Sequence, residues 1–248
     1  MLSEYPTEML GIASASVSGW MLYEYLNFYV NLNWYYPFSH QLTGDKNNDQ
    51  VFLLYSIIGS SGLLPMAFEW YDLMLTVPWL SNRFDAGVKY TMPTGRKIVL
   101  LIVALAGISC LGLFSLQIFY LWLWPLIIIS IVLSFLKVWT PFTPIKAGNW
   151  TPLLIFALAY LVQGFVMEGW NYFSAVHENG EAVRTYTPAY WAYKFPYVDG
   201  YEIFEMPVLG FLGYLPFSLY CWIWWIMYAV LLGIRTRYFD HTETYRHA

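Results

Sequence analysis

Residues 164–220 of this 248-residue chain contain three passages that decide how it folds: GFVMEGWNYF (164–173), YWAYKFPYVDGYEIFEMP (190–207) and VLGFLGYLPFSLY (208–220). The first passage places Glu168 and Asn171 inside an otherwise apolar segment. Burying a carboxylate without a partner in an apolar medium is costly, so such groups usually face a protein interior or a cavity. We therefore expect both side chains to have partners inside the folded protein.

The first third of the chain carries a weaker copy of these passages. LYEYLNF (22–28) places Glu24 and Asn27 at the spacing of Glu168 and Asn171. A Gly-x-x-Gly-x-Leu-Pro pattern occurs at 59–65 and again at 210–216. The remaining matches are Trp34 with Trp191 and Tyr36 with Tyr193. These matches predict an internal duplication, with copies at about 9–80 and 151–233 joined by a linking segment at 97–138.

The composition is typical of a membrane protein. Hydrophobic residues make up 58% of the chain and charged residues only 11%, with a mean hydropathy of +0.47. Soluble domains carry about 25% charged residues. The net charge of −4 comes without a basic cluster, so nucleic acid is not an expected partner.

The predicted fold is an all-α bundle of transmembrane helices in a single integral membrane domain. A helix needs about 20 apolar residues to cross the hydrocarbon core of a bilayer. Six segments approach this length, at about 9–30, 51–80, 97–116, 119–138, 151–172 and 206–233. We expect kinks near Pro65 and Pro216, because proline removes one backbone hydrogen bond from a helix.

The distribution of Lys and Arg predicts that both termini are cytoplasmic. This orientation leaves three basic residues outside, Lys46, Arg184 and Lys194, and places nine inside. The nine are Arg83, Lys89, Arg96, Lys97, Lys137, Lys146, Arg235, Arg237 and Arg246. Both copies then run in the same direction, as expected for repeats related by an axis along the membrane normal. The expected location is the bacterial inner membrane.

The strongest candidates for chemistry are Glu69, Glu168 and Tyr220. Glu69 follows Pro65 by one helical turn, and the duplication aligns Tyr220 with it. We expect the first span to lie near the fifth and the second near the sixth, around a polar centre formed by these three residues. A buried acid there is a candidate proton donor, and a hydrogen-bonded structural pair is the alternative.

A second set of candidates binds substrate or forms a structural polar cluster. Its members are Glu24, Asn27, Asn171, Trp34, Trp191 and Tyr193. Each Glu–Asn pair lies on one helix face at an i, i+3 spacing, so the amide can orient the carboxylate. The alternative is that these groups only tie the outer loops, 31–50 and 173–205, to the helix ends.

Metal and nucleotide chemistry have no support in the sequence. His40, His177, His241 and His247 occur without the spacings typical of metal ligands, and no phosphate-binding glycine motif is present. The predicted set of cofactors is therefore empty, apart from a bound lipid or carotenoid.

Two resemblances bear on function. The combination of YEYLN (23–27) and NWYYP (33–37) with WNYFSA (170–175), YWAYKFPY (190–197) and FEMPVLGFLGYLPF (204–217) resembles a family of uncharacterised bacterial multipass membrane proteins. The resemblance covers both copies and implies a membrane location without implying an activity. In that family an acid often follows the second LPF, where this chain has Tyr220.

A more distant similarity is to membrane proteins of the lycopene cyclase type, which have duplicated three-helix units. The matching positions are Trp191, Tyr193, Gly200, Pro207 and either Glu205 or Glu69. The paired acid after proline is missing from the second copy. This similarity implies proton-initiated cyclisation of a polyprenoid by an acid in an apolar cavity, without a cofactor.

Two functions follow as hypotheses. The first is a noncatalytic subunit that packs through aromatic helix faces into a larger membrane complex of the energy-converting or photosynthetic type. Its partners would be membrane lipid and other membrane subunits. The alternative is an isoprenoid- or carotenoid-binding protein, or a lycopene cyclase-like enzyme that uses buried carboxylates. The sequence favours the first, because its acids do not specify a reaction.

Overall fold

A computed structural model describes residues 6–39, 49–110, 123–194 and 200–239, and in this part the protein is mostly helical. The α-helices are α1 (Pro6–Leu26), α2 (Asp49–Ser61), α3 (Leu63–Leu75), α4 (Pro78–Ser81), α5 (Thr94–Ser109), α7 (Leu123–Phe135), α8 (Thr151–Phe173) and α9 (Tyr214–Leu232). A π-helical turn, η1 (Asn27–Asn31), follows α1, and the 3₁₀ segments are η4 (Thr143–Ala147) and η5 (Val208–Gly213).

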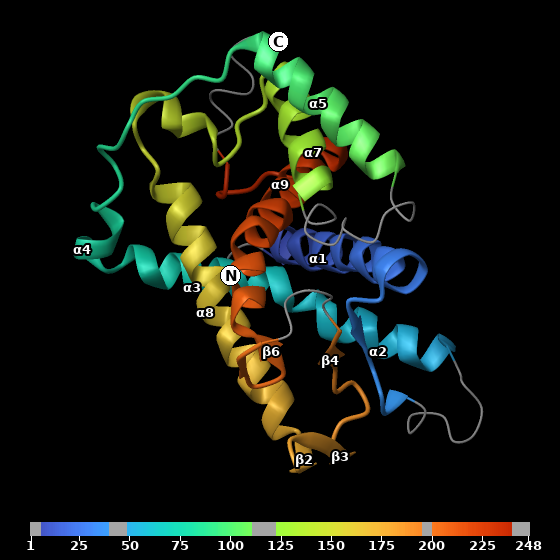
Figure 1. Ribbon diagram of the computed structural model, residues 1–248. Coiled ribbons are helices and arrows are strands. Elements are labelled where there is room, and N and C mark those ends of the chain that lie inside the picture. The colour runs from blue at the N-terminus through green and yellow to red at the C-terminus, as the bar shows by residue number, and fades with distance from the viewer. Residues whose placement is uncertain (1–5, 40–48, 111–122, 195–199, 240–248) are drawn as a thin grey trace.

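Helix α9 lies at the centre of the bundle. It packs against α1, α7 and α8, while α3 packs on both α1 and α8 and α5 packs on α7 (Figure 1). The aromatic run in α9 supplies much of the core: Trp222 and Trp225 are almost completely buried. The Trp222 ring meets Phe156 of α8 at 4.6 Å and Phe68 of α3 at 5.7 Å between centroids. These contacts hold the helices of the two predicted copies together.

The packing of the copies differs from the expected one. We expected the first span beside the fifth and the second beside the sixth, but α1 packs on α9 and α3 packs on α8. Each predicted copy therefore places its first helix against the second helix of the other copy. The sequence match could not distinguish these two arrangements, because both keep equivalent helices parallel.

Two helical stretches of the described chain are long and apolar enough to cross a membrane, Thr151–Phe173 and Val208–Leu232. Helix α7 is apolar but shorter. This finding rests on length and composition alone, and a buried helix of a soluble protein would meet the same two criteria. The two stretches are therefore a weak indication of membrane association. The turn expected between the third and fourth spans falls in 111–122, outside the described residues.

Both Gly-x-x-Gly-x-Leu-Pro passages mark helix starts. Helix α3 begins at Leu63 after a break at Gly62, and α9 begins at Tyr214 where η5 ends at Gly213. Pro65 and Pro216 are each the third residue of their helix. Proline is tolerated in a first turn because the backbone N–H there has no intrahelical partner. The kinks expected near these prolines are therefore breaks between two helical segments.

Short antiparallel strand pairs, which the all-α prediction missed, lie in the segments after α1 and α8. β1 (Trp34–Tyr35) pairs with β4 (Ala192–Tyr193), β2 (Ala175–Glu178) with β3 (Glu181–Thr185), and β5 (Glu202–Ile203) with β6 (Met206–Pro207). In Figure 1 the β2–β3 hairpin lies at the lower end of α8, and α5 and α7 lie at the opposite end of the molecule.

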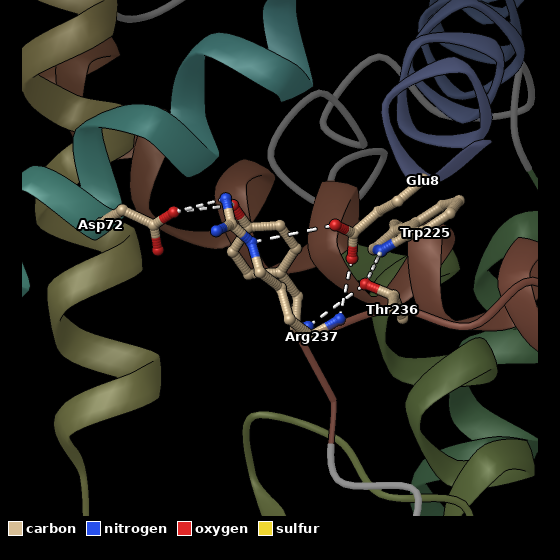
Figure 2. Close-up of polar contacts among 6 residues, drawn as sticks. Glu8, Asp72, Trp225, Thr236 and Arg237 are labelled. Carbon is tan, nitrogen blue, oxygen red and sulfur yellow. Dashed lines mark hydrogen bonds and ion pairs between the residues drawn. The ribbon is translucent and has the colours of Figure 1, made fainter. Parts of the chain in front are cut away.

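An ionic network joins α1, α3 and the segment after α9 at the N-terminal end of α1 (Figure 2). The Arg237 guanidinium donates to Asp72 of α3 at 2.8 Å, and the Arg237 backbone N–H donates to the Glu8 carboxylate of α1 at 2.8 Å. The Tyr238 hydroxyl also donates to Asp72, at 2.8 Å. The start of α1, the end of α3 and the segment after α9 therefore meet at one end of the bundle.

Candidate functional site

Two asparagines at equivalent positions make the same pair of hydrogen bonds. Asn27 donates from Nδ2 to the Trp34 carbonyl at 2.8 Å and accepts the Trp34 backbone N–H at 3.1 Å. Asn171 donates to the Trp191 carbonyl at 2.7 Å and accepts the Trp191 N–H at 3.0 Å. Both amides are almost completely buried. Each one fixes the W-x-Y segment that follows its helix.

We name Glu24, Asn27, Trp34 and Tyr36 the first cluster, and Glu168, Asn171, Trp191 and Tyr193 the second cluster. The W-x-Y segments of the clusters pair with each other as β1 and β4. Trp34 lies opposite Tyr193, and Tyr35 lies opposite Ala192. Because the pairing is antiparallel and centred on the middle residues, it relates the two segments by an approximate local two-fold axis.

The Glu24 carboxylate of the first cluster uses both of its oxygens. The Trp34 indole N–H donates to Oε1 at 3.4 Å and to Oε2 at 3.3 Å, and the Tyr36 hydroxyl donates to Oε1. The side chain is 6% exposed. Glu24 is thus a buried acid enclosed by donors from its own cluster, as expected of a structural carboxylate.

The Glu168 carboxylate of the second cluster is bonded differently. Its Oε1 accepts the hydroxyls of Tyr193 and Tyr214, each at 2.6 Å. The Trp191 indole N–H donates to the Tyr193 oxygen at 2.9 Å, so the Tyr193 proton is directed at Glu168. Among the described residues, Oε2 has no hydrogen-bond partner, although the side chain is 0% exposed.

Tyr214 is the member of this site that the sequence prediction missed. It reaches Glu168 because its ring lies against Gly164, one helical turn earlier on α8. A Cβ atom at Gly164 would come within 2.7 Å of the Tyr214 ring. The two-copy alignment places Leu63 opposite Tyr214 and Trp20 opposite Gly164, so the first cluster lacks this extra phenol. In the sequence, the glycine at 164 and the tyrosine at 214 were the signal from which this contact with Glu168 could have been predicted.

A cavity of about 580 Å³ lies between the two clusters. This volume falls in the range of about 300–1,000 Å³ that is typical of small-molecule sites. Its aromatic lining comes from both predicted copies: Trp20, Trp34, Tyr36, Tyr55, Tyr160, Trp191, Tyr193, Tyr214 and Phe217. Glu168 is the one carboxylate among the described residues that line it.

The cavity opens at the surface between α2 and η5. Tyr55 of α2 is 51% exposed, and Leu209 and Leu212 of η5 are 63% and 58% exposed, yet all three line the cavity. Gly59 and Gly213 also line it, and a Cβ atom at either position would meet no atom within 4 Å. The mouth is therefore apolar and leads directly to the outside of the helix bundle.

Burial keeps the tyrosines of the two W-x-Y segments protonated. Burial raises the pKa of the Tyr193 hydroxyl well above its ordinary value, and the negative charge of Glu168 raises it further. Burial raises the pKa of Tyr36 in the same way, with Glu24 adding to the effect. Both phenols therefore act as hydrogen-bond donors at neutral pH.

The structure does not assemble the expected centre of Glu69, Glu168 and Tyr220. Glu69 is exposed on the surface of α3. Tyr220 is completely buried, but its hydroxyl donates to the Gly19 carbonyl of α1 at 3.3 Å. The phenol that reaches Glu168 is Tyr214, one and a half turns earlier on α9. The prediction that these three residues form one polar centre is wrong, because α3 presents Glu69 away from the packed helices.

The remaining candidates all belong to the two clusters. Glu24, Asn27, Asn171, Trp34, Trp191 and Tyr193 all take part in the two clusters. His177 pairs with Glu205 at 2.7 Å and stacks on Tyr172, with 4.1 Å between ring centroids. His40, His241 and His247 lie outside the described residues.

Comparison of the chain with protein-family models, with curated proteins and with solved structures gives no match. The geometry of the cavity and its two flanking clusters is therefore the basis on which a function can be inferred.

Proposed function

We propose that this protein binds an elongated apolar ligand of the isoprenoid type in the cavity between the first and second clusters. The observation that carries the proposal is the cavity itself, which is large, lined mainly by aromatic and aliphatic side chains, and open through an apolar mouth. Flat aromatic walls contact an unsaturated, methyl-branched chain over a large area at little cost in side-chain entropy.

The polar groups of the lining favour an apolar ligand. The hydroxyls of Tyr193 and Tyr214 are directed at Glu168 and away from an incoming molecule. A strongly polar ligand would have to replace its hydration shell with donors that are already engaged. An apolar chain loses nothing on entry and gains buried area, at about 25 cal/mol per Å².

In this proposal the chain that encloses the cavity is a multipass protein of the bacterial inner membrane. It has six spans, an internal duplication and cytoplasmic termini. The two apolar helices α8 and α9, the repeated asparagine frame and the nine-to-three division of basic residues support it. The bonds of Arg237 also support it, because they join the start of α1 to the segment after α9. An even number of spans returns the chain to the side of the membrane on which it started. The ligand would then enter sideways from the lipid.

Titration of the detergent-purified protein with a polyene such as lycopene tests binding, read as quenching of tryptophan fluorescence. Trp20, Trp34 and Trp191 line the cavity, so a bound polyene should quench them in a saturable manner. Gly213→Leu should weaken binding about tenfold or more, because its side chain fills cavity space. Gly95→Leu is the matched control, since Gly95 also has open space around it but lies on α5 away from the cavity. Equal binding by both variants would contradict the proposal.

A noncatalytic subunit of a larger membrane complex is the second candidate, and the surface of α5 favours it. Ile98, Val99, Ile102, Val103 and Leu105 are all between 46% and 61% exposed on this helix. An exposed apolar helix face is covered either by lipid or by a partner helix. Purification from the native membrane in mild detergent distinguishes a lipid-covered face from one covered by a partner. Stoichiometric partner subunits would support assembly into a complex, and a lone protein would not.

A further inference from the structure

We infer that the ligand is an apolar chain that carries a hydroxyl group, and that this hydroxyl binds Oε2 of Glu168 after Tyr214 has moved aside. The inference rests on the proposed binding function and specifies its ligand class. It starts from the one buried carboxylate oxygen at the cavity that lacks a hydrogen-bond partner among the described residues, Oε2 of Glu168.

The first cluster shows that this unpaired oxygen is a specific difference between the two sites. In the first cluster the Trp34 indole reaches both oxygens of Glu24. In the second cluster the equivalent Trp191 indole donates to Tyr193, and Oε2 of Glu168 is left without a bond. A buried polar atom without a partner costs about 1–3 kcal/mol. A site that retains such an atom beside a cavity is suited to pairing it with a ligand.

A hydroxyl is the polar group that fits either protonation state of the acid. It can donate to an ionised carboxylate, and it can accept from a protonated one. A ligand carbonyl could only accept, and a ligand ammonium would bring a charge into a largely apolar cavity. Because the rest of the lining offers few free donors, a single hydroxyl on a long apolar chain satisfies the site best.

Tyr214 is the side chain that must move to admit this group. Less than 1 Å² of Oε2 is exposed, so a ligand atom cannot reach it past the present side chains. Tyr214 lines the cavity and bonds Oε1, the other oxygen of the same carboxylate. When the phenol turns aside, the ligand hydroxyl can donate to Oε2 of Glu168 and accept from Tyr214, while Tyr193 keeps its bond to Oε1.

The test compares two probes that differ only in the polar group: geranylgeraniol and the hydrocarbon of the same isoprenoid chain. The affinity of each for the detergent-purified full chain is measured by competition, as the concentration of probe that displaces a bound polyene and restores tryptophan fluorescence. One charge-assisted hydrogen bond gained in a buried site should favour the alcohol about tenfold. Glu168→Gln and Tyr214→Phe should reduce this ratio to about threefold or less while leaving hydrocarbon binding nearly unchanged.

Glu24→Gln is the matched control, because the same chemical change is made in the cluster whose oxygens are already paired. It should leave the alcohol-to-hydrocarbon ratio at the wild-type value. Equal wild-type affinity for the two probes would overturn the hydroxyl inference while preserving the proposed binding function. Failure of wild type to bind either probe or a polyene would instead overturn the proposed function.

Discussion

The first and second clusters share a backbone frame but differ in the environment of their acid. In both, a buried asparagine holds the W-x-Y segment by one donated and one accepted hydrogen bond. In the first, the tryptophan indole and a tyrosine close around Glu24. In the second, the indole turns to Tyr193, and Tyr214 arrives from another helix.

The comparison separates residues that build the fold from residues that can serve a ligand. The asparagines repeat because the chain needs their bonds at both positions. The surroundings of Glu168 differ from those of Glu24, since Tyr214 and Glu168 both line the cavity. A feature present in only one of the two clusters is the better candidate for function.

Replacing either asparagine with alanine should give the largest effect, and an equal one. Asn27→Ala and Asn171→Ala each leave a tryptophan N–H and carbonyl without their partner, which we expect to lower the free energy of unfolding by about 2–3 kcal/mol. Chemical unfolding of each variant in detergent measures this loss. A large cost at one position with none at the other would break the structural equivalence of the clusters.

Gly164→Ala should disturb only the second cluster. The added Cβ would lie 2.7 Å from the Tyr214 ring, so the ring must shift and its bond to Glu168 lengthen or break. Overpacking of this kind costs about 1–3 kcal/mol, measurable as a lower midpoint of thermal unfolding. Gly213→Ala is the control, because its Cβ meets no atom within 4 Å and should change the midpoint little.

Glutamine substitutions should separate the two acids. Glu24→Gln places an NH₂ group where one oxygen now accepts the Trp34 indole, and we expect a loss of about 1–2 kcal/mol in unfolding free energy. Glu168→Gln can keep its amide oxygen at Oε1 and place NH₂ at the unpaired Oε2, so the expected loss is about 1 kcal/mol or less. Equal losses would contradict the assigned bonding difference.

Alkaline pH should weaken both clusters slightly. The folded-state pKa values of Tyr36 and Tyr193 are raised above the unfolded value of about 10. Their contribution to stability is therefore complete below about pH 10 and falls as the pH rises above it. Unfolding of wild type, Tyr36→Phe and Tyr193→Phe over this range should show a shallower decline in each variant. A steeper decline in either would contradict the assignment of these phenols as buried donors.

The sequence predicted the polar frame well because its parts lie close to helix ends. The i, i+3 spacing of each Glu–Asn pair and the repeated W-x-Y segment identified seven of the eight cluster members as site candidates, and Tyr36 entered as a matched position. The distances along the chain differ, since Asn27 bonds a residue 7 positions on and Asn171 one 20 positions on. The longer separation accommodates the β2–β3 hairpin, which the helical prediction did not include.

What the sequence could not supply is the direction in which each helix turns its side chains. Glu69 and Tyr220 align in the two predicted copies, but one is exposed on α3 and the other is buried against α1. The crossed packing of α1 on α9 and of α3 on α8 brings Tyr214 to Glu168 in place of Tyr220. Helix pairing depends on long-range packing of aromatic side chains, for which local spacing carries no signal.

The most direct test of the central claim, that the cavity between the clusters holds an apolar ligand, is to identify what the protein carries out of its native membrane. Wild type and Gly213→Leu are purified in mild detergent, and their organic extracts are compared by absorption spectrum and mass. The account predicts an isoprenoid at near-stoichiometric amount with wild type and a large reduction with the cavity-filling variant. Extracts of both proteins that contain the same bulk lipid, with no isoprenoid enriched in wild type, would contradict it.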